Sequence, residues 1–538
     1  MYRRPHSVAR LVHSVRRMST PKIILTETES KIRDLLVDYT NHYNSSLLEN
    51  EQQKGLELRI TGGWVRDKLL GLESNDIDIA IDHTTGVEFA EGLQEYVQHD
   101  DDVSQKDKMV GIHKIDKNPE KSKHLETCKT KILGQEIDLV NLRNETYTEE
   151  SRVPTVEYGT PEEDAFRRDA TINALFYNLH TGLVEDFTRR GLEDLAKGLI
   201  RTPLPPRQTF LDDPLRCLRL IRFAGRFNFD IVEECKAAMS TSEIHDVLVS
   251  KVSKERVGIE VGKMLRGPNV EKCLRLMYDT KIYKAIFNFG EAQEGVLTVN
   301  PERIREIDEH LLSQQEDTLK LITELLPQLE TLLTDNANLQ ESYRSIKAQP
   351  ESQYLYYISL ILSHWSGVAP FKTKLSKSTP LSPVELVLKY SLRMPTKDVT
   401  HSRKIVENYP KFISFVHQVA QSPDGLARSQ LGLAIMPFGQ DWPSFIITCF
   451  ILDSFQASHT ESPQYHTILE AYSHIYREIV EQNLTETYKL RPLMDGKTLG
   501  LKLGKKPGPW MKEALDHMIV WQLDNPSGGI DDYFASKQ

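Results

Sequence analysis

The sequence has few cysteines and no long apolar run. Its 538 residues include 5 cysteines, which are scattered along the chain without a CxxC pair: Cys128, Cys217, Cys235, Cys273 and Cys449. This spacing argues against a zinc site and against a disulfide framework, and it favours a reducing compartment. No run of about 18 apolar residues is present, so the sequence predicts no membrane span.

The chain also lacks an excess of basic residues. Its net charge of -10 argues against a generally basic surface for nucleic acids. A local basic groove is still compatible with that charge, because the field in a cleft depends on nearby groups. Hydrophobic content of 39% and charged content of 27% fit a soluble globular protein. The length allows about three or four domains, or one large elongated helical body.

The N-terminal segment lacks acids altogether. It reads MYRRPHSVARLVHSVRRMSTPK, with several arginines and serines and no acidic residue before Glu27. This composition is typical of a mitochondrial presequence, so residues 1–20 are predicted to be a targeting segment. Met18 provides a second start that would give a cytosolic or nuclear form. The alternative is a disordered basic arm.

A short stretch near residue 70 combines a glycine turn with paired acids. It reads TGGWVRDKLLGLESNDIDIAID over residues 61–82, after an alternating segment that predicts a strand over 56–60. The segment after the glycines predicts a short helix that ends at Gly71. Residues 76–81 alternate again, so Asp76 and Asp78 are expected on one face of a strand. Carboxylates this close repel each other unless cations lie between them, and oxygen ligands suit magnesium.

The glycine turn decides between two interpretations of these acids. On their own, Asp76 and Asp78 are also compatible with solvated residues on an edge strand. However, Gly62 and Gly63 followed closely by Arg66 can hold a triphosphate, while two metals align the attacking and leaving oxygens. The combination indicates phosphoryl or nucleotidyl transfer.

The rest of this region predicts a small mixed sheet. Residues 84–97 predict a helix capped by threonine, and residues 108–115, 124–133 and 135–142 predict strands, the last two joined at Gly134. The sheet is therefore expected over residues 56–142, with one or two covering helices. Asp138 on the last strand either brings a third carboxylate to the first two or faces solvent.

From residue 160 the sequence predicts almost only helices. Apolar residues recur three and four apart, as in residues 257–267 and 318–333, and no internal repeat is evident. Polar residues 335–352 are predicted to be a surface connection or a helix end, and residues 369–383 a loop. The fold class is therefore α+β, with a sheet-containing head followed by an extended helical neck, body and tail.

A second group of charged residues follows the sheet. Residues 163–179 predict a helix that places Arg168 and Asp169 near Asn173, and residues 186–195 predict a polar turn leading into another helix. In residues 210–227, Asp212 and Asp213 are expected in the first turn of a helix, with Pro214 at an early position.

Four arginines recur along that last helix: Arg216, Arg219, Arg222 and Arg226. Because residues three apart share a helix face, Asp213 and Arg216 can present their head groups together. The alternative is an intrahelical ion pair beside solvated arginines. The neighbouring apolar residues favour a helix with one buried face and a basic ridge toward a cleft.

An aspartate and an arginine side by side can distinguish nucleobases. Cytosine and adenine both offer an exocyclic amine, which a carboxylate accepts, beside a ring nitrogen to which a guanidinium donates. Uracil and guanine reverse both polarities, leaving unpaired groups at a cost of about 1–3 kcal/mol each. Asp213 and Arg216 could thus accept CTP and ATP and reject UTP and GTP without a template.

In this order, the motifs resemble those of class II CCA-adding tRNA nucleotidyltransferases. They are GGWVRDKLLG with NDIDIA, then RRDATINAL, DFTRRGLEDL, DDPLRCLRLIRFAGRF and SKERVGIEVGKML. The C-terminal segment from LMDGKTLG to WQLDNP resembles the tail of the eukaryotic enzymes. The resemblance implies a nucleotidyltransferase head and the addition of C, C and A to tRNA from CTP and ATP, with release of pyrophosphate. It also implies Mg²⁺ as the cofactor, no zinc, and a monomer.

The resemblance also implies a role for each site residue. Asp76 and Asp78 would be the catalytic residues that hold two magnesium ions. The nucleotide would be bound in three places: its triphosphate by Gly62, Gly63 and Arg66, its ribose by Arg168, Asp169 and Asn173, and its base by Asp213 and Arg216. Asp212 would orient the base-reading pair, and Arg219 and Arg222 could meet phosphates.

Other residues are given secondary roles by the same resemblance. Arg143, Glu145 and Tyr147 are candidates for the switch from CTP to ATP. Glu255, Arg256 and Glu260 are expected to brace the neck. Lysines near Trp510 form a candidate phosphate site, with a solvated tail loop as the alternative.

The predicted domains are a targeting segment over 1–20, a head over 30–180, a neck over 181–270, a body over 271–410 and a tRNA-binding tail over 411–538. Predicted locations are the mitochondrion, the cytoplasm and the nucleus. Two alternative functions remain: a poly(A) polymerase of the same superfamily and a noncatalytic RNA-binding relative.

Overall fold

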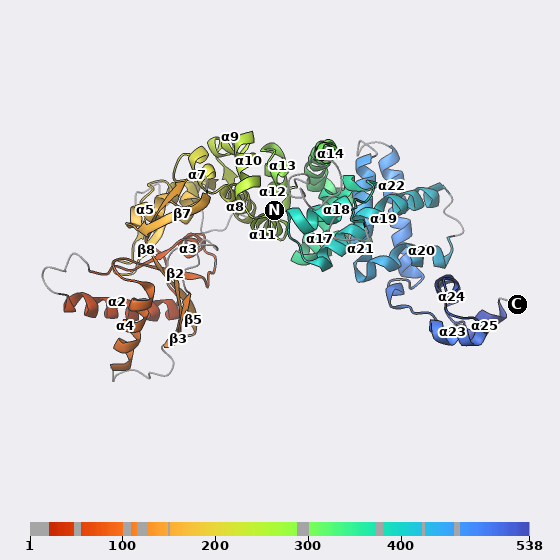
Figure 1. Cartoon of the computed structure of the whole chain (residues 1–538), viewed down its shortest axis with the longest axis horizontal. Helices are drawn as coiled ribbons and strands as arrows, with labels where there is room; N and C mark the ends of the chain where they lie inside the picture. Colours follow the sequence, from red (N-terminus) through yellow and green to blue (C-terminus); the bar gives the residue numbers. More distant parts are fainter. Residues whose placement is uncertain are drawn as a thin grey trace. The chain divides into compact units, whose positions relative to one another are not determined.

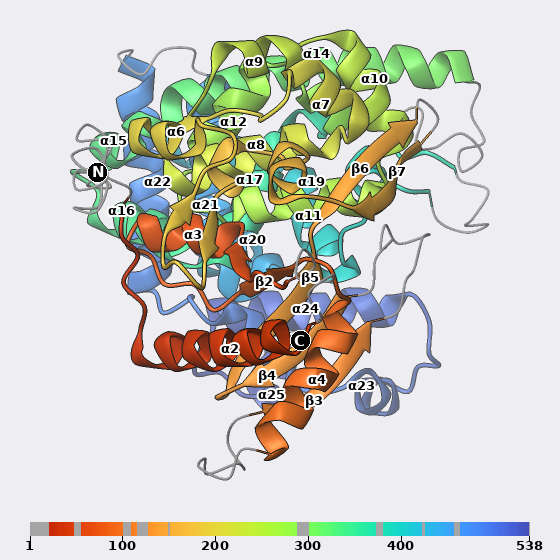
Figure 2. The same ribbon diagram turned by 90° about the vertical axis from the view of Figure 1, so that its left-hand side faces the viewer.

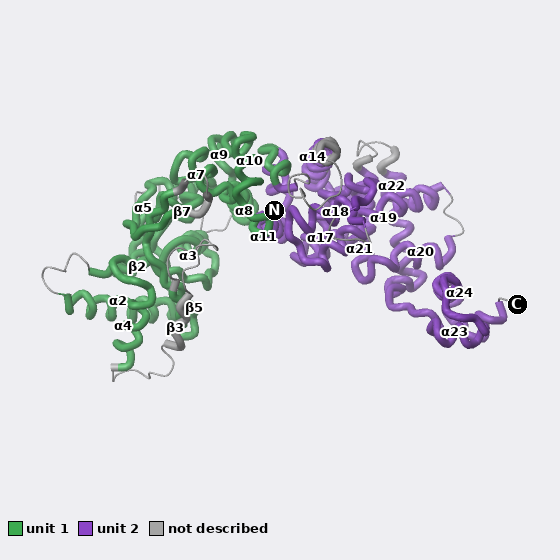
Figure 3. The backbone as a smooth tube through the Cα atoms, in the orientation of Figure 1, with its two compact units in different colours: residues 1–256, 279–285 green, residues 257–278, 286–538 purple. Residues whose placement is uncertain are grey.

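The structure is a computed structural model of the whole chain that describes residues 21–47, 55–99, 109–115, 127–148, 151–287, 301–372, 380–421, 426–456 and 463–536. The predicted targeting segment and Met18 lie outside these residues. The chain forms two compact units (Figure 3). Unit 1 contains residues 1–256 and 279–285, and unit 2 contains residues 257–278 and 286–538.

A mixed sheet forms the core of unit 1 (Figure 1). Its strands are β1 (Arg59–Thr61), β2 (Ile77–Ile81), β3 (Met109–Ile115), β4 (Thr127–Ile132), β5 (Gln135–Asn141), β8 (Phe176–Asn178) and β9 (Val184–Glu185). They lie in the order β3-β4-β5-β2-β1-β8-β9. The strands predicted between residues 56 and 142 are confirmed. Strands β8 and β9 extend the sheet beyond the predicted range.

Local sequence explains how the strands are connected. Leu133 and Gly134 both have positive φ, at 49° and 80°, as a two-residue hairpin turn between β4 and β5 requires. The predicted helices α3 (Gly63–Leu69) and α4 (Gly86–His99) are present. Helix α4 packs on β3, β4 and β5, and α2 (Glu27–Ser46) packs on α4 (Figure 2). Thr26 begins α2 with a capping box to Glu29.

The helix predicted over residues 163–179 is wrong for most of its length. Helix α5 (Pro161–Phe166) is short, and the 3₁₀ turn η4 (Thr171–Asn173) follows it. The chain then enters β8, which pairs with β1 in an antiparallel register. Pairing with a distant strand outweighs the helical spacing of the apolar residues in this segment.

The arginine-bearing helix α8 (Leu215–Phe227) is confirmed, but its start differs from the prediction. Asp212 ends the preceding helix α7 (Pro206–Asp212), and Asp213 is extended, with φ -134°. Helix α8 begins only after Pro214. Asp212 therefore does not lie in the first turn of α8. The ring of a proline disfavours the helical conformation of the residue before it, so Asp213 stays extended and the helix begins after Pro214.

Further elements surround these in unit 1. They are the hairpin of β6 (Arg143–Thr148) and β7 (Ser151–Tyr158), the short pair β10 (Leu199–Ile200) and β11 (Asp230–Ile231), and the helices α6 (Gly191–Lys197), α9 (Glu233–Met239) and α10 (Ser242–Lys251). Helix α6 follows the predicted polar turn, in which Asp186 accepts a hydrogen bond from the amide of Leu192 at 3.0 Å.

The remainder of the described chain is helical, as predicted. Its longer helices are α11 (Lys254–Leu265), α12 (Val270–Asp279), α14 (Pro301–Leu325), α16 (Ala337–Ala348), α17 (Pro350–Ile361), α19 (Thr396–Gln421), α20 (Arg428–Ile435), α21 (Trp442–Gln456), α22 (Pro463–Glu481), α23 (Gly496–Leu503) and α24 (Trp510–Asp524). Shorter ones are α13 (Tyr283–Ile286), α15 (Leu329–Leu332), α18 (Pro383–Leu386) and α25 (Ile530–Ala535).

Residues 335–352, predicted to be a surface connection or a helix end, are mostly occupied by α16, so the connection is wrong. Leu339, Tyr343 and Ile346 are buried on one face of this helix. Their spacing of four and three residues is the helical signal within an otherwise polar segment. In the other predicted connection, Phe371 and Leu381 form an isolated β-bridge.

One helical stretch, Arg428–Ser454, has the length and composition to cross a membrane, although the sequence predicts no span. Within unit 2 it is interrupted at Gly439, whose backbone is not helical. Ile446, Ile447 and Phe450 are fully buried, and α21 packs against α16, α17, α19 and α22. The stretch is therefore apolar because it is buried among these helices in the core of unit 2.

Candidate active site

A cavity of about 580 Å³ lies within unit 1, between the sheet, the β6–β7 hairpin and α8. Every site residue predicted from the sequence lines it except Asp76: Gly62, Gly63, Arg66, Asp78, Arg168, Asp169, Asn173, Asp213, Arg216, Arg219 and Arg222. The structure thus brings together residues from widely separated motifs. Arginines outnumber acids in the lining, so the cavity attracts anions.

The glycine turn is constrained by close contacts. Gly62 has φ 75°, and a β-carbon there would lie 3.0 Å from a guanidinium nitrogen of Arg168. The backbone conformation therefore favours glycine, and the side chain of Arg168 leaves little room for a larger residue. The amide of Gly62 donates to the carbonyl of Leu175 on the way into β8, at 3.3 Å.

Arg66 is buried behind the glycine turn and fixed by several groups. It donates to Asp67 at 2.8 Å and to the side-chain oxygen of Asn173, and it lies 4.5 Å from the ring centre of Phe227. Asp67 also accepts from Arg226 of α8 at 3.0 Å. These contacts fix α3 to α8, so the two elements present their cavity-lining groups together.

Polar side chains form a row across the sheet face that borders the cavity. Thr61 of β1 is paired with Asp78 of β2, Asp78 with Asp138 of β5, and Asp138 with Lys129 of β4. Directly paired residues point to the same face of a sheet. Lys129 donates to both carboxylate oxygens of Asp138, at 2.6 and 2.7 Å. Asp138 therefore does bring a third carboxylate beside Asp78, with its charge offset by a lysine.

The negative charge around Asp78 is only partly compensated by Arg168 and Lys129. Burial, together with the charges of Asp76 and Asp138, raises its pKa to about 6. Asp76 itself is exposed and precedes β2, which begins at Ile77. The alternation of residues 76–81 predicts that Asp76 and Asp78 share one face of a strand. The register of β2 places Asp78 in the cavity, but Asp76 lies outside the strand and is not positioned by this register.

The donor set suits a hard divalent cation. The described residues contain no group of three or more His, Cys, Asp and Glu side chains that could hold a metal ion. Asp76 and Asp78 offer carboxylate oxygens only, and Asp78 lies where negative charge is unbalanced. Mg²⁺ usually binds one or two carboxylates together with substrate phosphates, so a site completed by a triphosphate fits these residues. Beside Asp78, the buried hydroxyl of Thr61 has no hydrogen-bond partner in the described structure.

The segment after α5 is held by buried charges. Although burial raises the pKa of Asp169, Arg219 and Asn173 lower it to about 2. Arg219 donates to Asp169 at 2.6 Å, and the Asn173 amide donates to the other oxygen of Asp169 at 3.0 Å. Asp169 is thus ionised, and it connects η4 to α8.

The pair predicted to read bases lies on the α8 side of the cavity. The carboxylate of Asp213 accepts from the amide of Leu215 at 3.2 Å and lies 3.7 Å from Arg256. The guanidinium of Arg216 donates to the carbonyl of Arg167 at 2.8 Å and lies 3.8 Å from Glu145. Both side chains are therefore anchored within reach of the cavity. Asp212, predicted to orient them, accepts instead from Gln208 at 2.7 Å.

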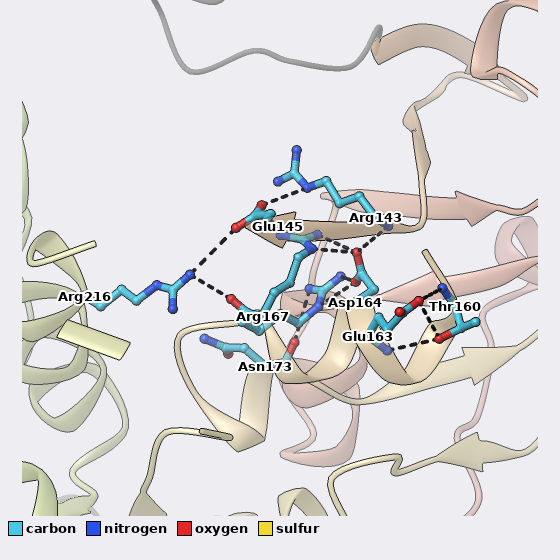
Figure 4. Close-up of polar contacts among 9 residues, drawn as sticks. Arg143, Glu145, Thr160, Glu163, Asp164, Arg167, Asn173 and Arg216 are labelled. Carbon is cyan, nitrogen blue, oxygen red and sulfur yellow. Dashed lines mark hydrogen bonds and ion pairs between the residues drawn. The ribbon is translucent and has the colours of Figure 1, made fainter. Parts of the chain in front are cut away.

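Three residues of the site are missed or misjudged by the sequence analysis. Arg167 lines the cavity and contacts both Glu145 and Arg216 (Figure 4). Arg256 also lines the cavity, although the resemblance implies a bracing role. Buried Asp164 holds Arg167 and Arg168. The sequence signal for Asp164 is its spacing of three and four residues from these arginines within a helix. The side chain of Tyr147 lies outside the described residues.

Known proteins resemble the chain over nearly its whole length. Two family profiles match it: the poly A polymerase head domain over residues 58–201, and a probable RNA and SrmB-binding site of polymerase A over residues 228–293. The mitochondrial CCA tRNA nucleotidyltransferase of Saccharomyces cerevisiae is 42% identical over 517 residues, which cover 95% of this chain and 92% of that protein. The protein of the same name from Candida glabrata is 40% identical over 530 residues, which cover 96% of each chain.

A solved structure shares the fold. The Thermotoga maritima CCA-adding enzyme complexed with tRNA superposes with a TM-score of 0.57 at 19% identity, covering 99% of this chain and 98% of that one. The α+β class predicted from the sequence, with a nucleotidyltransferase head and a helical remainder, is confirmed.

Proposed function

The chain belongs to the family of CCA tRNA nucleotidyltransferases, and on this basis we propose that the unit 1 cavity is its active site. The protein is an enzyme that adds C, C and A to the 3′ end of tRNA from CTP and ATP. The observation that carries the proposal is the convergence of Asp78 from the sheet with Asp213 and Arg216 from the α8 region on one cavity. One end supplies carboxylates for the reaction, and the other supplies groups that can read a base.

The triphosphate would lie against the glycine turn. Gly62 and Gly63 leave room for a close approach of phosphate oxygens, and the arginine-rich lining offsets their charge. Buried Arg66 donates to Asp67 and Asn173, and these bonds stabilise the adjacent glycine turn. Arg219 and Arg222 extend the same positive surface along α8. These features support binding of a nucleoside triphosphate with its phosphates toward Asp78.

We infer that Asp76 and Asp78 hold Mg²⁺. A divalent ion there would neutralise charge on the triphosphate and favour ionisation of the attacking 3′-hydroxyl. The raised pKa of Asp78 supports this role, since a cation relieves the repulsion from Asp76 and Asp138. Lys129 already offsets the charge of Asp138.

Ribose recognition is assigned to the residues between α5 and β8. Arg168, Asp169 and Asn173 line the cavity, and Asn173 donates to Asp169. Their mutual hydrogen bonds fix these polar side chains in place, which suits recognition of a 2′-hydroxyl, a group that both donates and accepts. Base recognition is assigned to Asp213 and Arg216, by the donor and acceptor pattern that cytosine and adenine share. Arg143 and Glu145 of β6 lie beside this pair and are candidates for the change from CTP to ATP.

Substitution of the two aspartates tests these assignments. Asp78→Ala is expected to abolish addition of every nucleotide to tRNA lacking its 3′ triplet. Asp213→Ala is expected to leave some transfer but to raise the use of UTP relative to CTP by about tenfold or more, because the penalty for the wrong base falls. The measurement is the ratio of kcat/KM values for each nucleotide, with exposed Glu234→Ala as the control. Equal loss for all nucleotides without misincorporation would contradict the base-reading role.

We also infer the wider setting of the enzyme. A head over residues 30–180, a neck over 181–270, a body over 271–410 and a tRNA-binding tail over 411–538 would act as a monomer. The names of the relatives support a mitochondrial location. A start at Met18 would give cytoplasmic and nuclear forms that keep all described elements, since α2 begins at Glu27.

A further inference from the structure

A single buried carboxylate connects two sides of the proposed nucleotide site. Asp164 of α5 is 1% exposed, and its two oxygens are used by different arginines (Figure 4). Arg167 donates to Oδ1 at 2.9 and 2.5 Å. Arg168 donates to Oδ2 at 3.0 and 2.7 Å. Asp164 does not line the cavity itself, so any effect on substrate passes through these two arginines.

The Oδ2 side leads to the residues assigned to the ribose. Arg168 donates from its remaining nitrogen to the carbonyl of Asn173 at 3.2 Å, and its guanidinium lies against the glycine turn. Asn173 in turn donates to Asp169 and accepts from Arg66. Without the two bonds to Asp164, the guanidinium of Arg168 would no longer be held in one orientation, and the backbone carbonyl of Asn173 would lose a fixed donor.

The Oδ1 side leads to the residues assigned to the base. Arg167 also donates to Glu145 of β6 at 2.9 Å, and its backbone carbonyl accepts from Arg216. The amide of Arg143, at the start of β6, donates to the same Oδ1 at 3.3 Å. One oxygen of Asp164 therefore fixes the start of β6, the side chain of Arg167 and, through Arg167, the guanidinium of Arg216.

We propose that Asp164 is a positioning residue that sets ribose selection and base selection together. The proposal rests on the proposed function of the cavity. The buried carboxylate holds both arginines in a fixed geometry, because each guanidinium donates two charge-assisted hydrogen bonds to one of its oxygens and loses them if it moves. The carboxylate also balances part of the arginine excess beside the cavity.

The test measures selectivity rather than activity. Asp164→Asn keeps the shape of the side chain but removes the charge and half of its acceptor capacity. Two ratios of kcat/KM are measured on tRNA lacking its 3′ triplet: CTP against dCTP, and CTP against UTP. Both are expected to fall by about tenfold or more. Glu157→Gln, at an exposed acid of β7, makes the same charge change and is expected to keep both ratios.

The outcomes separate this inference from a general loss of structure. A variant that is merely less stable would lose activity toward all nucleotides by one factor and would keep both ratios. If Asp164→Asn does not fold, Arg168→Lys and Arg167→Lys replace it: the first is expected to lower the ribose ratio and the second the base ratio. Wild-type ratios in the asparagine variant, or in either lysine variant, would overturn the inference. Absence of CCA addition by the wild-type protein would instead overturn the proposed function.

Discussion

At the scale of single residues, the site depends on buried acids that are each held by arginines. Asp164 and Asp169 are almost fully buried, and opposing effects act on both. Burial raises their pKa values, but neighbouring arginines lower them to about 2. Asp78 differs, because burial and other acids raise its pKa to about 6. Asp164 and Asp169 are therefore ionised and fix the walls of the site, whereas Asp78 faces the cavity with a raised pKa.

The depressed pKa of Asp164 predicts how its contribution to stability changes with pH. The pKa is about 2 in the folded protein and about 3.9 in an unfolded chain. The unfolded state therefore binds more protons as the pH falls, and the stabilisation is complete above the unfolded value and lost as the pH approaches 2. The unfolding free energy of wild type relative to Asp164→Asn is expected to fall by roughly 1 kcal/mol between pH 7 and pH 3. Urea unfolding at both pH values measures this difference, and a pH-independent gap would contradict it.

The sequence predicts the cavity-lining residues better than the residues behind them. Asp78, Arg168 and Arg216 belong to motifs whose spacing and chemistry already indicate a nucleotide site. Asp164 does not, because its partners lie partly on β6 and only the fold brings that strand next to α5. Alternation also extends the predicted strand to Asp76, one residue before β2 begins at Ile77.

At the scale of elements, close backbone approach limits the helices of unit 2. Gly258 lies on α11, and a β-carbon at this position would overlap the carbonyl oxygen of Leu392. Gly262 lies one turn further along the same helix. A β-carbon there would lie 2.8 Å from a guanidinium nitrogen of Arg266, which is the far end of a long side chain and not backbone. The two glycines thus share a helix but differ in what surrounds them.

This difference predicts unequal outcomes for two alanine substitutions. Glycine to alanine in a helix normally stabilises it by about 1 kcal/mol. Gly258→Ala is instead expected to destabilise the protein by roughly 3 kcal/mol or more, because backbone must move. Gly262→Ala is expected to stay within about 1 kcal/mol of wild type, since Arg266 can shift. Thermal unfolding of both variants checks the comparison, and equal effects would contradict the packing of α11.

The errors in predicted elements have two physical causes. Residues 163–179 carry helical spacing, but residues 176–178 complete the sheet by pairing with β1, a contact that local sequence does not encode. Residues 335–352 are mostly polar. The buried face of α16 contains only three large apolar residues, so its helical spacing is a weak signal in the sequence. The strands around Gly134 are predicted correctly because the alternation and the turn chemistry agree.

At the scale of the whole molecule, nucleotide transfer and tRNA binding by the tail are expected to involve different parts of the chain. The described groups that can bind a nucleotide lie in unit 1, whereas unit 2 is a helical body with its own buried core. The proposed selection of C and A uses side chains and no nucleic-acid template. A template-independent enzyme of this kind must stop after a defined product, in contrast to a poly(A) polymerase, which adds an open-ended tract.

The most direct test is to identify the product that the purified protein forms on tRNA that lacks its 3′ triplet. With CTP alone, addition of C residues is expected; with CTP and ATP together, the product is expected to end in CCA and to grow no further. UTP and GTP are expected to give no extension, because both leave the proposed Asp213 and Arg216 pair unmatched. An open-ended adenosine tract, or efficient extension with UTP or GTP, would contradict the account.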